Sequence, residues 1–168
     1  MGFIAESISD LRLNLNVTLN KSSIEMSETE YQSRLENARL GESIDSYRAM
    51  AGQSPYLING GLSYGGGKEG FWSRFEAGLY YNVQGSALEF VGAADRPDIY
   101  VEPFHSLNFN SSISFGKSEK MSLGLKVQNV LNEEIQLVYK SYNATNQYFE
   151  RRSPGILSTL KFTYRFGS

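Results

Sequence analysis

Few residues of this chain could carry out covalent chemistry. Cysteine is absent and His105 is the only histidine. A thiolate nucleophile is therefore excluded, and a transition-metal site is disfavoured. His105 follows Pro103 and Phe104, where a long connection enters a predicted strand, and there a structural or interfacial role is favoured over a general base. With no G-x-S-x-G nucleophile motif in the sequence, we predict a protein that is not an enzyme and that holds no cofactor or metal ion.

Two further patterns have simple structural interpretations. The run Gly65-Gly66-Gly67 lacks the Lys-Ser/Thr and the helix that complete a phosphate-binding loop, so it is typical of a hairpin turn. The pair Glu133-Glu134 could suggest two carboxylates that share a proton or a cation. Adjacent residues point apart, however, and a solvated loop is favoured.

The long connections are better candidates for function, because loops carry many binding residues. In the segment 27–41, Ser27 and Glu30 fit a capping box and Gly41 fits a helix stop, which predicts a short helix. Its charged residues could face a ligand, although a salt-bridged solvated surface is the simpler interpretation. Tyrosine suits stacking on sugars or peptides, and it suits packing between loops equally well. The candidate ligand-contacting residues of the connections are Arg34, Arg39, Arg96, Tyr100, Tyr142 and Tyr148.

The elements that must position these residues are strands. In LRLNLNVTLN (11–20), five aliphatic residues alternate strictly with five polar ones, which is the period of a strand. The same alternation recurs along the chain, and most of the segments are longer than the ~5–6 residues usual in globular proteins. The predicted strands cover about 11–25, 55–65, 71–83, 104–116, 120–129 and 154–166.

The connections alternate in length. Two are tight turns, at 65–70 and 116–120, whereas the connections 26–54, 84–103 and 130–153 are long. An up-and-down antiparallel meander places all three long connections at one end, as the extracellular loops are placed in bacterial outer-membrane barrels. The sequence therefore predicts an all-β, antiparallel up-and-down meander of about six long strands.

The periodicity leaves open which face is wet. In a transmembrane barrel the apolar face meets lipid, whereas in a soluble lipocalin-like barrel it lines a site for a small apolar ligand. Strand length, loop asymmetry and aromatic residues near both strand ends favour the membrane. The formal net charge of -2 favours no nucleic-acid partner. The N-terminus has no basic and apolar leader pattern, which indicates either a cytoplasmic protein or an incomplete natural chain, in which Met1 is an internal or artificial start.

Five stretches resemble one family. The stretch VQNVLN (127–132) is similar to a signature near the C-terminus of TonB-dependent outer-membrane receptors, and LKFTYRF (160–166) is similar to the last strand of outer-membrane barrels. The stretches RAMAGQSPY (48–56), ADRPD (94–98) and PFHSLN (103–108) resemble the C-terminal barrel region of such receptors from Bacteroidetes-type bacteria. Gly167 and Ser168 after the last aromatic residue depart from the pattern.

The resemblance implies a position for the whole chain, 1–168, in the C-terminal part of a 22-stranded transmembrane β-barrel. The implied function is energised nutrient uptake across the bacterial outer membrane. The implied partners are membrane lipid, the N-terminal plug and remaining strands of the same receptor, TonB through the plug, and a surface lipoprotein. A structural or adhesive outer-membrane barrel without TonB coupling is the further alternative.

Overall fold

The computed structural model describes residues 10–66, 70–93 and 95–166. The chain is predominantly β, with 55% of its residues in strands and 10% in helices, and all of its sheets are antiparallel. The predicted all-β class is therefore confirmed. The described residues include no helix with the length and apolar character that crossing a bilayer requires.

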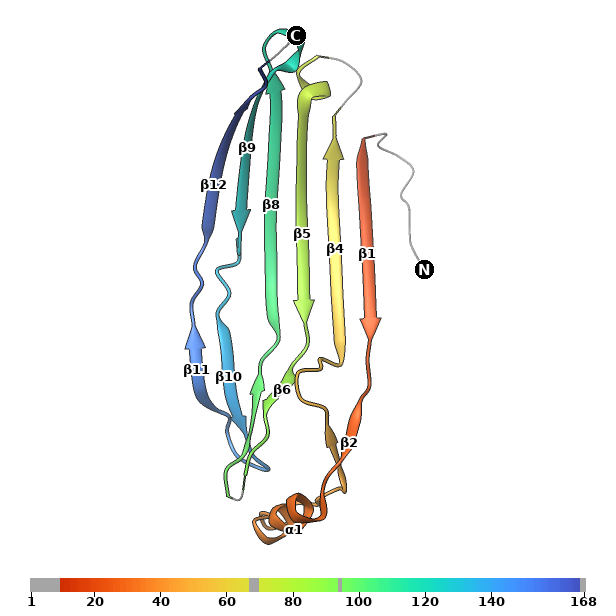
Figure 1. The fold of residues 1–168 in the computed structure, drawn as a ribbon, viewed down its shortest axis with the longest axis vertical. Coiled ribbons are helices and arrows are strands. Elements are labelled where there is room, and N and C mark those ends of the chain that lie inside the picture. Colours follow the sequence, from red (N-terminus) through yellow and green to blue (C-terminus); the bar gives the residue numbers. More distant parts are fainter. Residues whose placement is uncertain (1–9, 67–69, 94, 167–168) are drawn as a thin grey trace.

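The six predicted long strands form one sheet, which we call the main sheet (Figure 1). Each strand pairs with the next one along the chain, so the predicted up-and-down meander is confirmed. In the described part of the chain the sheet does not close, and β1 and β12 are its two edges. The strands are β1 (Leu11–Leu19), β4 (Tyr56–Gly65), β5 (Phe75–Gln84), β8 (Phe104–Phe115), β9 (Met121–Gln128) and β12 (Leu157–Tyr164).

Several predicted boundaries were wrong by a few residues. The first strand ends at Leu19 rather than at 25, because its partner β4 is preceded by Pro55, which has no N–H for the ladder. The segment 71–74 is a 3₁₀ turn, η1 (Phe71–Arg74), so β5 begins only at Phe75. The last strand covers 157–164 rather than 154–166. Part of the first predicted turn, 67–69, lies outside the described residues.

The register places most apolar side chains of the main sheet on one face, because directly paired residues project to the same side. Leu57, Tyr80, Phe104 and Leu157 are on the other face, where their pairing partners are polar residues or glycine. One row across this apolar face consists of Leu13, Leu62, Leu79, Phe109 and Val127. A row across the polar face consists of Asn16, Asn59, Asn82 and Ser106. The sequence alternation thus becomes two chemically opposite surfaces.

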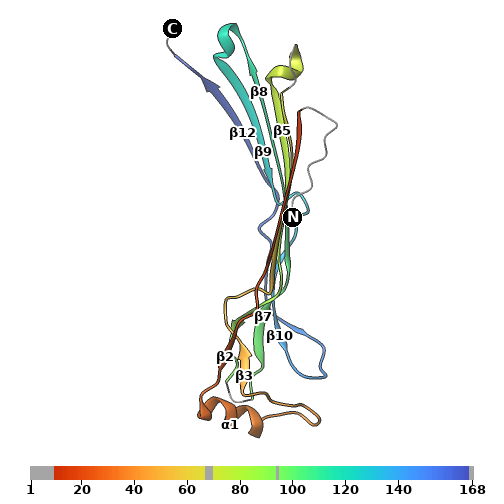
Figure 2. The same cartoon turned by 90° about the vertical axis from the view of Figure 1, so that its right-hand side faces the viewer.

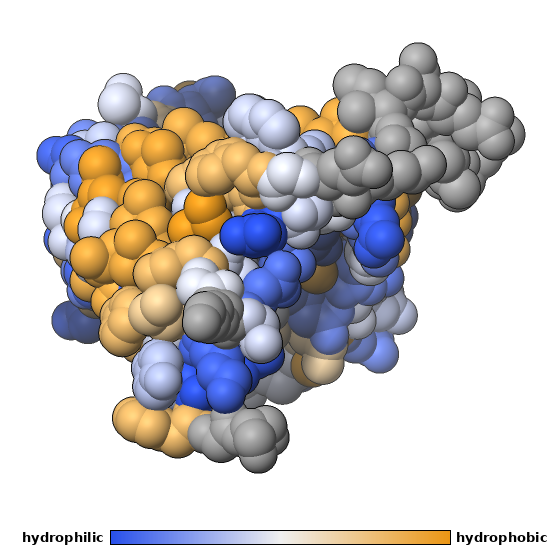
Figure 3. Space-filling model, turned by 90° about the horizontal axis from the view of Figure 1, so that it is seen from above, coloured by the Kyte–Doolittle hydropathy of each residue, from blue (hydrophilic) through white to orange (hydrophobic). Residues whose placement is uncertain are grey.

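The main sheet is a single layer, and no other element of the described part of the chain is stacked on it (Figure 2). Large apolar side chains are consequently exposed, for example Leu13 (53%), Leu160 (71%) and Phe162 (61%). Seen along the long axis, apolar residues gather on one side of the molecule and hydrophilic residues on the other (Figure 3).

The three long connections lie together at one end, as predicted, and we call them the distal region (20–55, 85–103 and 129–156) (Figure 1). They are not irregular loops, which corrects the prediction for 26–54, 84–103 and 130–153. A four-stranded sheet has the order β11-β10-β7-β6, and β2 (Ser23–Glu25) pairs with β3 (Tyr47–Ala49). The four strands are β6 (Ala87–Phe90), β7 (Asp98–Val101), β10 (Ile135–Lys140) and β11 (Gln147–Arg152).

The hydrophobic core lies mainly in this distal region. Leu88 is the one fully buried large side chain among the described residues, with 1% exposure. Four other buried apolar residues belong to the same region, namely Met26, Ala87, Leu137 and Val138. The distal region therefore has an interior of its own, which the main sheet lacks.

The predicted helix forms as α1 (Glu28–Glu36). The Ser27 hydroxyl accepts the N–H of Glu30 at 3.2 Å, so the predicted N-cap is confirmed. The predicted stop at Gly41 was wrong, because the helix already ends at Asn37, whose side-chain amide donates to the Ser33 carbonyl at 2.8 Å. Gly41 (φ +85°) lies in a later turn.

Candidate functional site: the distal cavity

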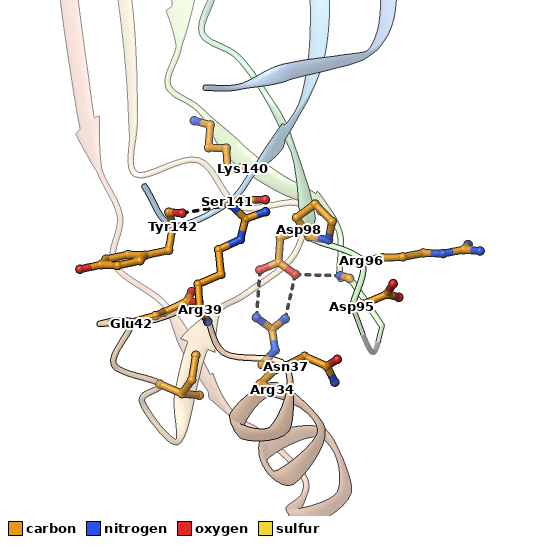
Figure 4. A pocket seen from close by; sticks show the side chains of 13 residues that line it. Arg34, Asn37, Arg39, Glu42, Asp95, Arg96, Asp98, Lys140, Ser141 and Tyr142 are labelled. Carbon is orange, nitrogen blue, oxygen red and sulfur yellow. Dashed lines mark hydrogen bonds and ion pairs between the residues drawn. The ribbon is translucent and has the colours of Figure 1, made fainter. Parts of the chain in front are cut away.

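All three connections contribute to one cavity of about 140 Å³ in the distal region, which we call the distal cavity (Figure 4). The connection 20–55 supplies the end of α1 and the segment after it, and the other two supply the tips of their hairpins. The lining residues are Arg34, Asn37, Arg39, Glu42, Ile44, Gly92, Asp95, Arg96, Pro97, Asp98, Lys140, Ser141 and Tyr142. Charged residues predominate, so the cavity is suited to polar ligands.

A two-pronged ion pair forms one wall of the distal cavity. The guanidinium of Arg34, near the end of α1, donates to both carboxylate oxygens of Asp98 at 2.8 and 3.2 Å. The Gly92 backbone N–H also donates to Asp98, at 2.7 Å (Figure 4). Burial opposes the charge of Arg34, but the hydrogen bond and the charge of Asp98 outweigh it and raise the pKa of the guanidinium. This pair joins α1 to the start of β7.

A second charge contact ties α1 to β3. The carboxylate of Glu30 accepts from Arg48 Nε at 2.7 Å and lies 3.6 Å from Arg34 Nε. The Glu30 carboxylate therefore pairs with arginines. It does not accept the backbone N–H of Ser27, which is the second hydrogen bond of the predicted capping box. No residue of α1 is buried. The helix is held in place mainly by its ion pairs and its cap.

Lys140 is neutralised beside the cavity. Its ammonium lies 2.8 Å from the Glu102 carboxylate and donates to Ser86 Oγ at 3.1 Å. The same ammonium lies 5.0 Å from the centre of the Tyr100 ring, which is a cation–π contact. Burial first, and then the charge of Asp98, raise the pKa of the Tyr100 phenol. Tyr100, a predicted ligand contact, thus packs under Lys140 and does not line the cavity.

Arg39 has the least occupied cationic group that faces the cavity. Its guanidinium makes one long contact, 3.4 Å, with the Tyr142 carbonyl, and its backbone N–H donates to Glu42 at 2.9 Å. Arg96 lies at the rim, and its side chain extends away from Arg39 (Figure 4). Among the described residues no carboxylate pairs with either guanidinium.

The structure brings together four of the six predicted ligand-contacting residues, namely Arg34, Arg39, Arg96 and Tyr142. Tyr148 lies elsewhere on β11, where its ring contacts the guanidinium of Arg151 at 4.9 Å. Sequence reasoning missed Asp98 and Lys140 as members of the site. Their only signal was a charge within a predicted loop, and a pairing such as Arg34 with Asp98, 64 positions apart, follows from tertiary structure.

His105 lies on the apolar face of the main sheet, away from the cavity. Its Nδ1 atom is 2.6 Å from the Tyr81 hydroxyl, so it has a structural hydrogen bond. Within the described ranges no three His, Asp or Glu side chains converge as metal ligands would. No protein-family model, no curated protein and no solved structure matches the chain.

Proposed function

We propose that this chain forms part of the wall of a TonB-dependent receptor that imports a nutrient across the bacterial outer membrane. The observation that carries the proposal is the uncovered apolar face of the main sheet, opposite a polar face, on strands of 8 to 12 residues. Tilted transmembrane strands need about 9–11 residues. Membrane lipid is then the first partner, and it covers the apolar face of the main sheet.

Water would be a poor solvent for this apolar face. Soluble monomers rarely expose contiguous apolar patches of more than a few hundred Å². In the main sheet the exposed apolar residues run from Leu11 on one edge strand to Phe162 on the other. Hydrocarbon removes this cost, and the alternating polar side chains then line the interior.

The two open edges support a larger barrel. Unpaired backbone groups at a sheet edge cost several kcal/mol each in hydrocarbon, so transmembrane sheets close. β1 runs towards the distal region and β12 runs away from it, as Figure 1 shows. Further strands that pair antiparallel with both edges must therefore be even in number. A 22-stranded barrel of the kind that the resemblance implies meets this condition.

Aromatic residues gather at the short-turn end of the apolar face, as they do at membrane interfaces. Trp72 packs against Tyr64 and Phe75 with ring centroids 6.3 and 5.9 Å apart, and Phe71 lies 5.3 Å from Trp72. At the other ends of the strands, next to the distal region, fewer aromatic side chains lie on the apolar face than the sequence predicted. Tyr56 and Tyr81 lie on the apolar face, but Phe104 pairs with Gln84 on the polar face and Tyr100 belongs to the distal sheet.

The polar face offers a surface for the plug that the resemblance implies. A hollow of about 320 Å³ is lined by Arg12, Glu76, Tyr80 and Asn110 of this face, by Tyr64, and by small residues. The Tyr80 ring lies across Gly78, where a Cβ atom would come within 2.6 Å of it. The hollow exists because these small residues leave the space above the sheet open. In the proposed receptor the distal region captures the substrate, while TonB acts on the plug from the other side.

The test is the location and the sidedness of the native polypeptide. An antibody against the exposed segment 27–48 should detect a band several times larger than 18.8 kDa in the outer-membrane fraction and should label intact cells. An antibody against the short-turn segment 70–74 is the matched control and should label only permeabilised cells. An 18.8 kDa band in the soluble fraction would overturn the proposal.

A further inference from the structure

The distal cavity contains two guanidinium groups that face it, and they differ in one respect. Arg34 has a carboxylate partner within the chain, whereas Arg39 has none among the described residues. The two arginines lie five positions apart, at the end of α1 and just beyond it. The way in which Arg34 binds its carboxylate therefore indicates which chemical group Arg39 can bind.

The Arg34–Asp98 pair shows how a guanidinium in this cavity binds a carboxylate. Both oxygens of Asp98 accept from the two terminal nitrogens of Arg34, and a backbone N–H completes the contact. Such forked pairs are stronger and more directional than single hydrogen bonds. Asp98 therefore occupies Arg34 and leaves it unavailable to an external anion.

Arg39 has the same forked donor set without an acceptor to match it. A guanidinium has five N–H donors, and that of Arg39 uses one, at 3.4 Å. Lys140 does not compete for a ligand, because Glu102 and Ser86 hold its ammonium. The Ser141 hydroxyl lines the same cavity and makes no side-chain hydrogen bond within the described ranges.

Other charges near Arg39 limit what can bind. Glu42 lines the cavity and accepts the backbone N–H of Arg39, so a negative charge lies close by. Asp95 and Arg96 are neighbours at the rim (Figure 4). The net electrostatic attraction for anions is therefore weak in this cavity. A ligand has to gain its affinity from the paired, directional hydrogen bonds of the Arg39 guanidinium.

We propose that Arg39 binds a carboxylate group of the ligand, with the Ser141 hydroxyl as a second donor. The size of the cavity, about 140 Å³, suits one terminal group of a larger molecule. The substrate class is thus a carboxylate-bearing small molecule or peptide. The inference rests on the proposed function for its biological meaning, because it names the substrate of that receptor.

The experiment titrates the full chain in detergent micelles with sodium acetate and follows two NMR signals. One is the Nε–Hε signal of Arg39, and the other is the backbone amide of Ser141 in the cavity lining, which is present in every variant. Sodium chloride at equal concentration controls for ionic strength, and inorganic phosphate tests the alternative anion. We expect a saturable shift with acetate only. Arg39→Gln should weaken acetate binding at least tenfold, since hydrogen bonds to charged groups contribute about 1.5–3 kcal/mol. Arg39→Lys, which keeps the charge but loses the fork, should bind with intermediate affinity.

Arg152→Gln is the matched control, because it removes an equal charge from an exposed arginine of the distal region that does not line the cavity, and it should leave acetate binding unchanged. The proposal is overturned by an equal response to chloride, by preference for phosphate, or by equal loss in Arg152→Gln. These outcomes are independent of cell fractionation. A chain found in the outer membrane that does not bind acetate refutes the carboxylate site alone. A soluble chain that binds acetate refutes the receptor alone.

Discussion

The main sheet and the distal region are built from the same antiparallel strands, but they place their apolar side chains in opposite ways. Five of the six buried apolar residues of the described structure lie in the distal region, and the sixth, Val83, lies at its border. In β1 every residue is exposed, including its four leucines. The distal region buries its own apolar residues, whereas the main sheet leaves its apolar residues exposed.

Under the proposed function, the two regions depend on different solvents. The distal region has a core, ion pairs and a capped helix, which are the devices of a protein domain in water. The main sheet has backbone hydrogen bonds and little side-chain burial, so its stability depends on whatever covers its apolar face. In the receptor that we propose, lipid covers the apolar face of the main sheet and water surrounds the distal region.

The largest expected effect comes from opening a cavity in the distal core. Leu88→Ala removes the one fully buried large side chain among the described residues. We expect a loss of about 2–5 kcal/mol in the unfolding free energy of the distal region, the range for leucine truncation in cores. Hydrogen exchange of the β6, β7 and β10 amides measures it. Leu40→Ala, at a fully exposed leucine of the same region, should change exchange little.

A charge on the apolar face should have the next largest effect, and its sign separates lipid from water. Leu13→Arg places a cation on that face, in the first half of the edge strand β1. In a bilayer it should cost up to about 2–4 kcal/mol, the range at the bilayer midplane. The measurement is the unfolding free energy in lipid vesicles. In water the same change, at a side chain that is already 53% exposed, should be neutral or should improve solubility.

Asn14→Arg is the matched control for the leucine substitution. Asn14 is the next residue of β1, is also exposed, and points to the polar face. It should cost little in the bilayer. If both substitutions lowered the unfolding free energy in vesicles equally, the proposal that the apolar face contacts lipid would be contradicted.

A smaller effect is expected where the distal region depends on charge. Arg34→Ala removes the pair with Asp98 and should reduce the free energy of opening of α1 by about 1–2 kcal/mol, since the pair is only partly buried. Amide exchange of α1 measures this, and high salt should weaken the wild-type helix in the same way. Arg96→Ala is the control, because no carboxylate among the described residues pairs with Arg96. An unchanged α1 in Arg34→Ala would show that other contacts hold it.

The sequence predicted the main sheet well and the distal region poorly, for a physical reason. Strict alternation, as in Leu11–Leu19, is a local property that survives in the structure as two faces. The distal strands lack it: β11 reads QYFERR and contains a register shift opposite Leu137 and Val138. Its pairing depends on β10, which the local pattern does not encode.

The candidate site was predicted in part for the same reason. Ser27 as an N-cap and the charges that follow it are local signals, and they located α1 together with Arg34 and Arg39. The partners Asp98 and Lys140 come from connections about 60 and 100 positions further along the chain. Long-range pairs of this kind become visible only when the meander brings its three distal hairpins together.

The smallest expected effect concerns Glu134, at the start of the β10–β11 hairpin. Hydrogen bonds from Ser153 and then Arg151, helped by the charge of Arg151, hold its pKa below the usual 4.5. A carboxyl with a lowered pKa stabilises the folded hairpin above the unfolded-state pKa, and this contribution is lost as the pH falls through the lower folded value. The protection factors of the β10 and β11 amides, which correct for the pH dependence of the intrinsic exchange rate, should therefore fall as the pH falls below about 4.5, and Glu134→Gln should remove that fall. Glu133→Gln is the control, because the Glu133 side chain makes no hydrogen bond or ion pair within the described ranges. The Glu134 carboxylate and the Arg151 guanidinium both lie at the surface, so 1 M salt should suppress most of the effect. A salt-resistant pH dependence, or one that survives in Glu134→Gln, would show that the hairpin is stabilised by its packing against the distal core and not by this pair.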